Sequence, residues 1–143
     1  VGGLLHDIGT TLIPSEILNK TIPLITEEAA ILKHHPTLGY EIIESIHFPW
    51  PIKEIVRQHH EKMDGSGYPD GLSGSQIIPE ARIIAVADVF DALVSDRPFR
   101  DRYSKQQAIE LLLQEKGDKL DAYCVDTFIE CFNRDPTLGG VYP

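Results

Sequence analysis

The sequence predicts an all-α fold, and three observations indicate it. Apolar residues recur at helical spacing in several segments, most clearly over residues 79–96. Ser104 and Gln107 form a capping-box pattern, which is typical of a helix start. No segment shows the alternation of apolar and polar residues that a half-buried strand requires. We therefore expect one helical bundle over residues 1–133 and an irregular tail over residues 134–143.

The first third of the chain contains short helices broken by prolines. Residues 1–8 should form a helix that ends at Gly9, where the chain turns. Residues 10–23 contain two prolines and should form a connector with at most one brief helix. Thr26 is the expected N-cap of a helix that runs to His35, and the proline that follows starts a further helix.

The remaining helices flank one glycine-rich loop. A helix over residues 51–60 should carry two adjacent histidines at its C-terminal end, and the loop should occupy residues 61–78. Residues 79–96 should form the most apolar helix, with almost no solvent-facing side, so we expect this helix to be central. Helices over residues 104–116 and 120–132 complete the predicted bundle.

Composition limits the classes of function. The 143 residues carry a formal net charge of −9, which argues against binding of a nucleic-acid polymer, because such binding needs clustered Lys and Arg. The most apolar run, residues 83–94, contains two aspartates and is too short to cross a bilayer. We expect a soluble, cytoplasmic domain without membrane insertion. Cys124 and Cys131 are too far apart along a helix for a disulfide, and we interpret them as small core residues.

Histidines and aspartates gather at the expected helix ends and form the candidate metal ligands. Asp88 lies in the most apolar helix, where a buried carboxylate needs a cation or strong hydrogen bonds; the alternative is that it lies on that helix's one exposed line. Asp91 either orients a ligand or is a surface acid. We interpret His34 and His47 as surface or hydrogen-bonded residues. The six candidate ligands are His6, Asp7, His35, His59, His60 and Asp88.

The ligand types indicate a class of metal and of reaction. Imidazole and carboxylate without thiolate suit iron, manganese, nickel or catalytic zinc. Two such ions a few ångströms apart can activate water and hold a phosphoryl oxygen, which is what phosphodiester hydrolysis requires. Arg97 and Arg100 follow the apolar helix and could supply the local positive charge that a phosphate substrate needs; the alternative is solvated surface, which we favour for Arg102.

Five ordered motifs resemble the HD-GYP family. They are HDIG at 6–9, HP at 35–36 with Gly39, HHE at 59–61, DGSGYP at 64–69 and ADVFDAL at 87–93. The resemblance implies an all-α bacterial signalling domain, an HD-domain helical bundle with a glycine-rich GYP loop. It also implies hydrolysis of cyclic di-GMP to pGpG, GMP or both, at a centre of two or three divalent metal ions that commonly contains iron or manganese.

The resemblance assigns roles to individual residues. All six ligand candidates match the family's metal positions, and Asp7 matches the bridge between ions. The tyrosine ring of the GYP loop is expected to stack near a guanine. The positions that match substrate contacts are Gly67, Tyr68 and Pro69 on the loop, and Arg97 and Arg100 beyond the apolar helix.

Two departures from the family pattern bear on activity. Thr10 stands where the family usually has Lys, so one cationic phosphate contact is absent. The family also carries a further His ligand on a helix upstream of the HD pair, and we expect that the sequence given lacks this N-terminal part of the domain. The candidate catalytic positions are Asp7, Thr10 and Asp91.

Three functions fit these features. The first is a metal-dependent cyclic di-GMP phosphodiesterase. The second is a receptor or docking module that keeps the fold and the GYP loop but has lost its metal chemistry, for which Thr10 is the support. The third is an HD phosphohydrolase that acts on another cyclic dinucleotide, such as a mixed one. We expect cyclic di-GMP as the bound small molecule and protein partners at the GYP loop. A homodimer is a further possibility.

Overall fold

The protein is described here by a computed structural model that covers residues 1–96, 101–135 and 137. Within these ranges the chain forms helices, loops and two isolated β-bridges, without a strand, which confirms the predicted all-α fold. In chain order the helices are α1 (Gly2–Leu5), the 3-10 helix η1 (Ile8–Leu12), α2 (Ser15–Leu18), α3 (Thr26–Leu32), α4 (His35–Ile43), α5 (Ile52–Gln58), the 3-10 helix η2 (Gly74–Gln76), α6 (Pro79–Val94), α7 (Lys105–Glu115) and α8 (Ala122–Arg134).

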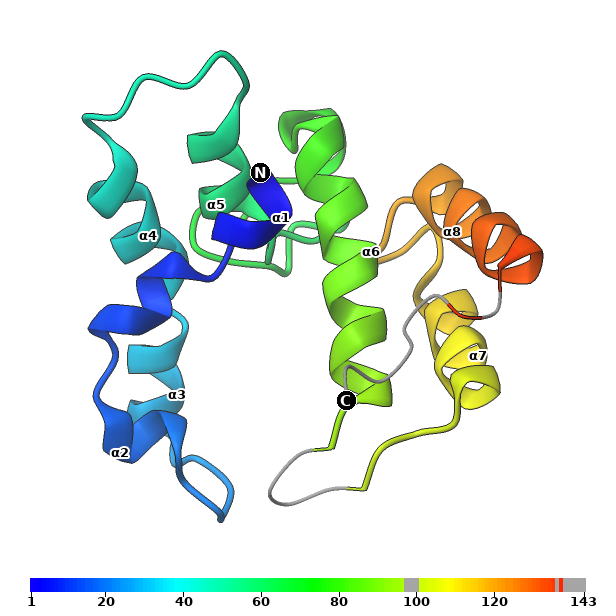
Figure 1. Cartoon of the computed structure of the whole chain (residues 1–143), viewed down its shortest axis with the longest axis horizontal. Coiled ribbons are helices and arrows are strands. Elements are labelled where there is room, and N and C mark those ends of the chain that lie inside the picture. Colours follow the sequence, from blue (N-terminus) through cyan, green and yellow to red (C-terminus); the bar gives the residue numbers. More distant parts are fainter. Residues whose placement is uncertain (97–100, 136, 138–143) are drawn as a thin grey trace.

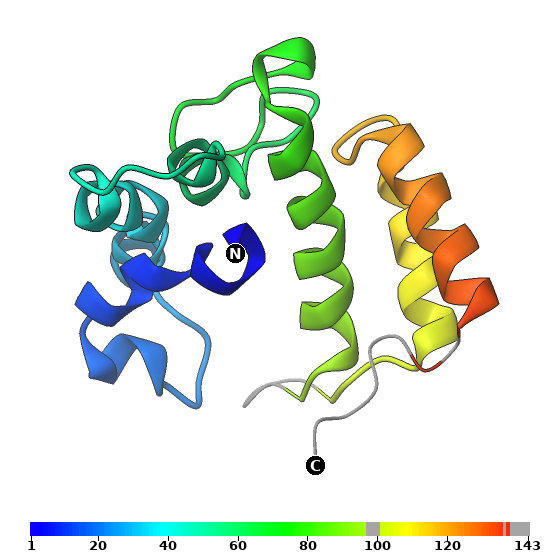
Figure 2. The ribbon, with the colours of Figure 1, turned by 45° about the horizontal axis from the view of Figure 1, so that its top comes forward.

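Helix α6 lies at the centre of the arrangement, as its apolar sequence predicts. In both views it separates the group formed by α1 to α5 from the pair α7 and α8 (Figure 1 and Figure 2). The short α1 packs on α5, and η1 packs on α4. The N-terminal segment therefore lies between the two ligand-bearing helices α4 and α5 and the central α6.

Two apolar clusters form the core, and α6 contributes to both. On one side, Ala85, Val86 and Phe90 of α6 pack with buried residues of α7 and α8. On the other side, Ile84 packs against a cluster formed by α4 and α5. The members of this second cluster are Ile43, Ile52, Ile55 and Val56. Asp88 lies on the same helix, between these packed faces.

The first helix is shorter than predicted. It ends at Leu5, and Gly9 lies inside η1 and does not follow a helix end. Gly9 has a tertiary role instead: η1 packs so closely on α4 that a Cβ atom on Gly9 would lie 1.9 Å from the carbonyl oxygen of His35 and 2.6 Å from the amide nitrogen of Gly39. A glycine at this position allows the two backbones to meet.

Capping signals give mixed outcomes. The capping box of Ser104 and Gln107 is confirmed, since each side chain bonds the backbone N–H of the other. At α3 the N-cap is Ile25, one residue before the predicted Thr26, and its N–H donates to the carboxylate of Glu28 at 2.9 Å. Both starts use a side-chain acceptor to satisfy a backbone N–H that no helical carbonyl reaches.

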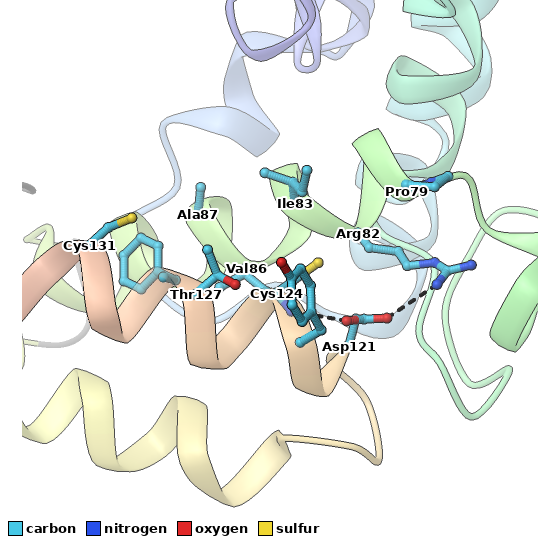
Figure 3. A pocket seen from close by; sticks show the side chains of 11 residues that line it. Pro79, Arg82, Ile83, Val86, Ala87, Asp121, Cys124, Thr127 and Cys131 are labelled. Atoms are coloured by element: carbon cyan, nitrogen blue, oxygen red, sulfur yellow. Dashed lines mark hydrogen bonds and ion pairs between the residues drawn. The ribbon is translucent and has the colours of Figure 1, made fainter.

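A groove on α6 corrects two expectations. Ile83 is 58% exposed and Ala87 is also exposed, so this helix does have a solvent-facing side. Both side chains line a cavity of about 480 Å³ between α6 and α8, together with Cys124 and the exposed Cys131, so Cys131 is not a core residue (Figure 3). Arg82 closes one end of the groove. This cavity contains none of the six ligand candidates.

The predicted C-terminal boundary of the domain, after residue 133, stays a prediction. Helix α8 ends at Arg134, one residue beyond the predicted end of the domain. Of the predicted tail, residues 136 and 138–143 lie outside the described residues. None of the helices in the described part of the chain combines the length and the hydropathy that a bilayer span would need.

Candidate metal centre and substrate cavity

The fold brings together all six predicted ligand residues from four separate places in the chain. His6 and Asp7 lie between α1 and η1, His35 begins α4, His59 and His60 directly follow the last residue of α5, and Asp88 lies in α6. Their ligand atoms form two groups in which all atoms lie within 4.8 Å of one another. The first group is Asp7, His35, His59 and His60, and the second is His6, Asp7 and Asp88.

Three of the histidines are held in one orientation by the backbone of the preceding helical turn. The Nδ1 atom of each lies close to the carbonyl oxygen three residues earlier in the chain, at 2.7 Å for His6 and 2.8 Å for both His35 and His59. An N–H that donates to a carbonyl fixes the hydrogen on Nδ1 and leaves Nε2 free for another partner. The helix ends thus present three Nε2 atoms to one point.

That point is the carboxylate of Asp7. Its Oδ1 atom lies 3.1 Å from Nε2 of His35 and 3.5 Å from Nε2 of His59. Its Oδ2 atom lies 3.3 Å from Nε2 of His6. Asp7 is therefore the member that the two groups share, and each of its oxygens faces a different group.

The nitrogen atoms of this cluster fit a cation. Nε2 of His35 and Nε2 of His59 lie 3.3 Å apart, and both rings are buried. If both Nδ1 atoms hold the hydrogens, two lone pairs face each other, which is unfavourable without a positive charge between them. Nε2 of His6 is also buried and has no hydrogen bond of good geometry. Imidazole and carboxylate donors of this kind suit a divalent transition metal.

Asp88 lies close to both His6 and His60. The Oδ1 atom of Asp88 lies 3.5 Å from Nε2 of His6, and Oδ2 lies 3.9 Å from Nδ1 of His60. Burial by itself would raise the pKa of Asp88, but the neighbouring imidazoles of His6 and His60 outweigh it and lower this pKa. Burial, with the charge of His59, lowers the pKa of His60 to about 3. Asp88 is thus ionised and His60 neutral at pH 7, the forms that bind a metal.

The electrostatics of the neighbouring residues His6 and Asp7 favour an ionised carboxylate on Asp7. Burial would raise the pKa of Asp7, but the neighbouring imidazoles of His35, His59 and His6 hold it far below its usual range. Asp7, followed by Asp88, raises the pKa of His6 to about 10. His6 therefore attracts a proton that a metal ion would have to displace.

The cluster lies in a cavity of about 380 Å³, within the range of small-molecule sites. Thr10 also lines it, with a hydroxyl that donates to the backbone carbonyl of Asp7 at 2.7 Å. The described residues that line the cavity do not include Asp91, which lies exposed on α6, so its catalytic role stays a prediction. Arg97 and Arg100 lie outside the described residues.

The GYP loop joins the cavity through Tyr68. The Tyr68 ring stacks on the ring of His60, with centroids 4.9 Å apart and planes 29° apart, and its backbone N–H donates to the His60 carbonyl at 3.2 Å. A Cβ atom on Gly67 would lie 2.4 Å from the amide nitrogen of Lys62, so this glycine allows the loop to lie against the end of α5. Gly67 and Pro69 are not among the described residues that line the cavity, and their contact with substrate stays a prediction.

Glu61 is a residue whose role the sequence did not indicate. It is buried, and its two carboxylate oxygens accept the backbone N–H groups of Asp70 at 2.7 Å and Leu72 at 2.9 Å. Asp70 also forms a bidentate ion pair with Arg57, at 2.7 and 2.8 Å. The GYP loop is thus tied to α5 at the residue after His60. A carboxylate directly after two histidines was the only signal, and it does not reveal whether the side chain points to metal, solvent or backbone.

Comparison with known proteins agrees with this site. A family model described as "HD domain" matches residues 1–123. The chain is 43% identical to the cyclic di-GMP phosphodiesterase response regulator RpfG of Xanthomonas campestris, over 87% of this chain and 34% of that protein. It is 41% identical to 3'3'-cGAMP-specific phosphodiesterase 2 of Vibrio cholerae, over 88% of this chain and 24% of that protein. The chain therefore spans about a quarter to a third of these relatives.

A solved structure shares the fold. The HDG"Y"P protein Bd1817 of Bdellovibrio bacteriovorus superposes with a TM-score of 0.73 at 25% identity, over 92% of this chain and 42% of that one. The alignment with an HD-GYP protein agrees with the ordered motifs from HDIG to ADVFDAL. The chain belongs to the HD domain family, and within it to the HD-GYP proteins.

Proposed function

We propose that this domain hydrolyses cyclic di-GMP to pGpG, GMP or both in bacterial second-messenger signalling, with two or three divalent ions, iron or manganese. One observation carries the proposal: the carboxylate of Asp7 is shared by two ligand groups at the wall of a cavity. Relatives that are 43% and 39% identical bear the name of cyclic di-GMP phosphodiesterases, which supports this substrate. A cytoplasmic location is part of the same proposal.

The ligand residues would hold the ions, and the rest of the cavity would hold the nucleotide. When bound, divalent ions supply Lewis acidity and water of lowered pKa for phosphodiester hydrolysis. The helices fix the imidazoles before binding, so little reorientation is needed. The ring of Tyr68 offers a flat face to a base, and apolar side chains of α2 and α3 exclude water from one side of the cavity.

A mixed cyclic dinucleotide is the second candidate substrate. A relative that is 41% identical is named for hydrolysis of 3'3'-cGAMP, which differs from cyclic di-GMP in one base. The described residues of the cavity offer no side chain that distinguishes guanine from adenine by itself. Protein partners at the GYP loop and a homodimer stay predictions.

The test uses the full-length protein, purified without oxygen and loaded with Fe(II) or Mn(II). We expect turnover of cyclic di-GMP, separated from pGpG and GMP by chromatography, and loss of turnover in Asp7→Ala. His34→Ala is the matched control, because His34 is exposed and outside both ligand groups. A metal-loaded protein that hydrolyses no cyclic dinucleotide would instead support the docking module for which Thr10 argues.

A further inference from the structure

Besides the ligand residues, the cavity is lined by residues of α2, α3 and the segment between them. Ile17, Leu18, Leu24 and Leu32 make this part of the cavity wall apolar. Lys20 is the exception, and among the described residues that line the cavity it is the sole Lys or Arg. A charged side chain in an apolar wall needs an explanation, because its charge is stable there only with partners.

With a cyclic dinucleotide bound, the cavity would hold more negative charge than positive charge near one phosphate, and Lys20 could balance it. Asp7 and Asp88 contribute negative charge, and a cyclic dinucleotide brings two phosphodiester groups that are both ionised at pH 7. Ions at the ligand groups can balance one phosphate together with the carboxylates. Thr10, on the same cavity surface, has a hydroxyl that already donates to a backbone carbonyl and adds no charge.

The ammonium group of Lys20 is held at the wall by Glu28 of α3. The two side chains form an ion pair, and both are about one-fifth exposed, at 20% and 23%. Glu28 is fixed in turn because it accepts the N–H of Ile25 at 2.9 Å. An ammonium group has three N–H donors, and one carboxylate oxygen occupies one of them. Two donors remain, and Lys20 lines the cavity.

We propose that Lys20 binds a phosphate of the substrate, and that this is the phosphate that is not being cleaved. The proposal rests on the proposed function above. Lys20 pairs with Glu28 and not with Asp7 or Asp88, so its charge lies apart from the ligand groups where cleavage would occur. It gives the cavity the cationic contact that Thr10 does not supply, from a different element. Lys20 is thus a substrate-binding residue, and it acts on affinity more than on the chemical step.

The alternative role for Lys20 is purely structural, as a link between α2 and α3 through Glu28. The two roles make different predictions for the two partners of the ion pair. If Lys20 only supports the wall, removal of either partner has the same effect. If Lys20 binds phosphate, removal of the ammonium weakens substrate binding, whereas removal of the Glu28 charge leaves the ammonium in the cavity.

The experiment compares KM and kcat for cyclic di-GMP in full-length, metal-loaded variants. Lys20→Met keeps the length of the side chain and should raise KM about tenfold or more, with kcat within about threefold of wild type, as expected for loss of a charged hydrogen bond. Lys20→Arg should restore KM because it restores the charge. Glu28→Gln should leave KM within about threefold. Lys116→Met removes a comparable ion pair, with Asp126, outside the cavity, and should change neither constant.

The outcomes separate this inference from the proposed function. An unchanged KM in Lys20→Met, or an equal rise in Glu28→Gln and Lys20→Met, would overturn the role of Lys20 while turnover by the wild type still supports the phosphodiesterase. A metal-loaded wild type without turnover of any cyclic dinucleotide would overturn the phosphodiesterase, and the role of Lys20 with it.

Discussion

His35 and His59 face each other through their Nε2 atoms, 3.3 Å apart, although they are 24 positions apart in the chain. Both rings are buried, and each Nδ1 atom contacts the carbonyl oxygen three residues earlier in the chain. Two neutral imidazoles in this arrangement repel each other unless a proton or a cation lies between them. This pair therefore makes the stability of the domain sensitive to metal ions.

The first prediction concerns metal binding. Addition of Mn(II) or Fe(II) at about one hundred times its dissociation constant should stabilise the folded protein by about 2.7 kcal/mol, and a chelator should reverse this. His35→Ala should lose most of the gain. His34→Ala should keep it, because that neighbouring ring is exposed and belongs to neither ligand group. Thermal denaturation with and without metal measures the difference, and an equal gain in all three proteins would contradict a site at His35.

The second prediction concerns the contact between η1 and α4. Gly9→Ala should lower the free energy of unfolding by about 2 kcal/mol or more, because its Cβ would collide with backbone that cannot move independently. Gly3→Ala is the matched control: the nearest atom to its Cβ is the flexible end of Ile84, at 3.4 Å, and alanine favours a helix by up to about 1 kcal/mol. Urea denaturation compares the two. Equal stabilities of the two variants would mean that η1 does not pack on α4 in this way.

The third prediction concerns the GYP loop. Glu61→Ala removes the acceptor of two backbone N–H groups, at a cost of about 1–3 kcal/mol for each group that stays buried. Amide hydrogen exchange should become faster at Asp70 and Leu72. In Asp64→Ala, which removes an exposed acceptor of the Ser66 N–H, those two amides should keep their protection. Unchanged exchange at both amides in Glu61→Ala would show that Glu61 does not hold the loop.

The fourth prediction concerns the start of α8 and its pH dependence. Asp121 accepts the N–H of Cys124 at 3.0 Å and pairs with Arg82 at 3.2 Å. Burial would raise the pKa of Asp121, but these hydrogen bonds outweigh it and lower the pKa. The contribution is therefore complete above the unfolded pKa of about 3.9 and disappears as the pH falls through the lower folded pKa.

Asp121→Ala tests this contribution. At pH 7 the variant should be less stable by about 1 kcal/mol or somewhat more, as is usual for loss of an N-cap. The gap to wild type should close as the pH falls below about 4. Asp126→Ala breaks an exposed ion pair with Lys116 and should cost at most about 1 kcal/mol. A gap for Asp121→Ala that stays constant down to the lowest pH at which the protein folds would contradict the hydrogen-bonded, ionised cap.

The sequence predicted the central helix and the gathering of ligand residues because both leave local signals. Residues 79–94 are apolar at helical spacing, and histidines next to prolines and glycines mark helix ends. It could not predict that α1 stops at Leu5 and that Gly9 packs against α4, because that contact lies far along the chain. Burial on α6 was also misjudged at Ile83, since periodicity does not reveal which neighbouring helix covers a given side.

Several details of the site could not be predicted from the sequence for a similar reason. That Glu61 accepts loop amides and that Lys20 reaches the cavity both depend on side-chain direction, which sequence spacing leaves open. Thr10 and Lys20 show what the sequence does and does not reveal about the charge of the cavity. Its departure from the family pattern was visible in the sequence, but the cation elsewhere in the same cavity was not.

The division of the ligands between the chain's N-terminal end and α6 has a mechanical consequence. His6 and Asp88 are about 80 positions apart, and the residues Leu5 and Ile84 beside them on the two segments pack against the same apolar cluster. An ion bound between them would bind the folded state only, so any opening of the N-terminal segment away from α6 would also have to release the ion. The atoms that bind the ions would therefore also keep the N-terminal segment against α6.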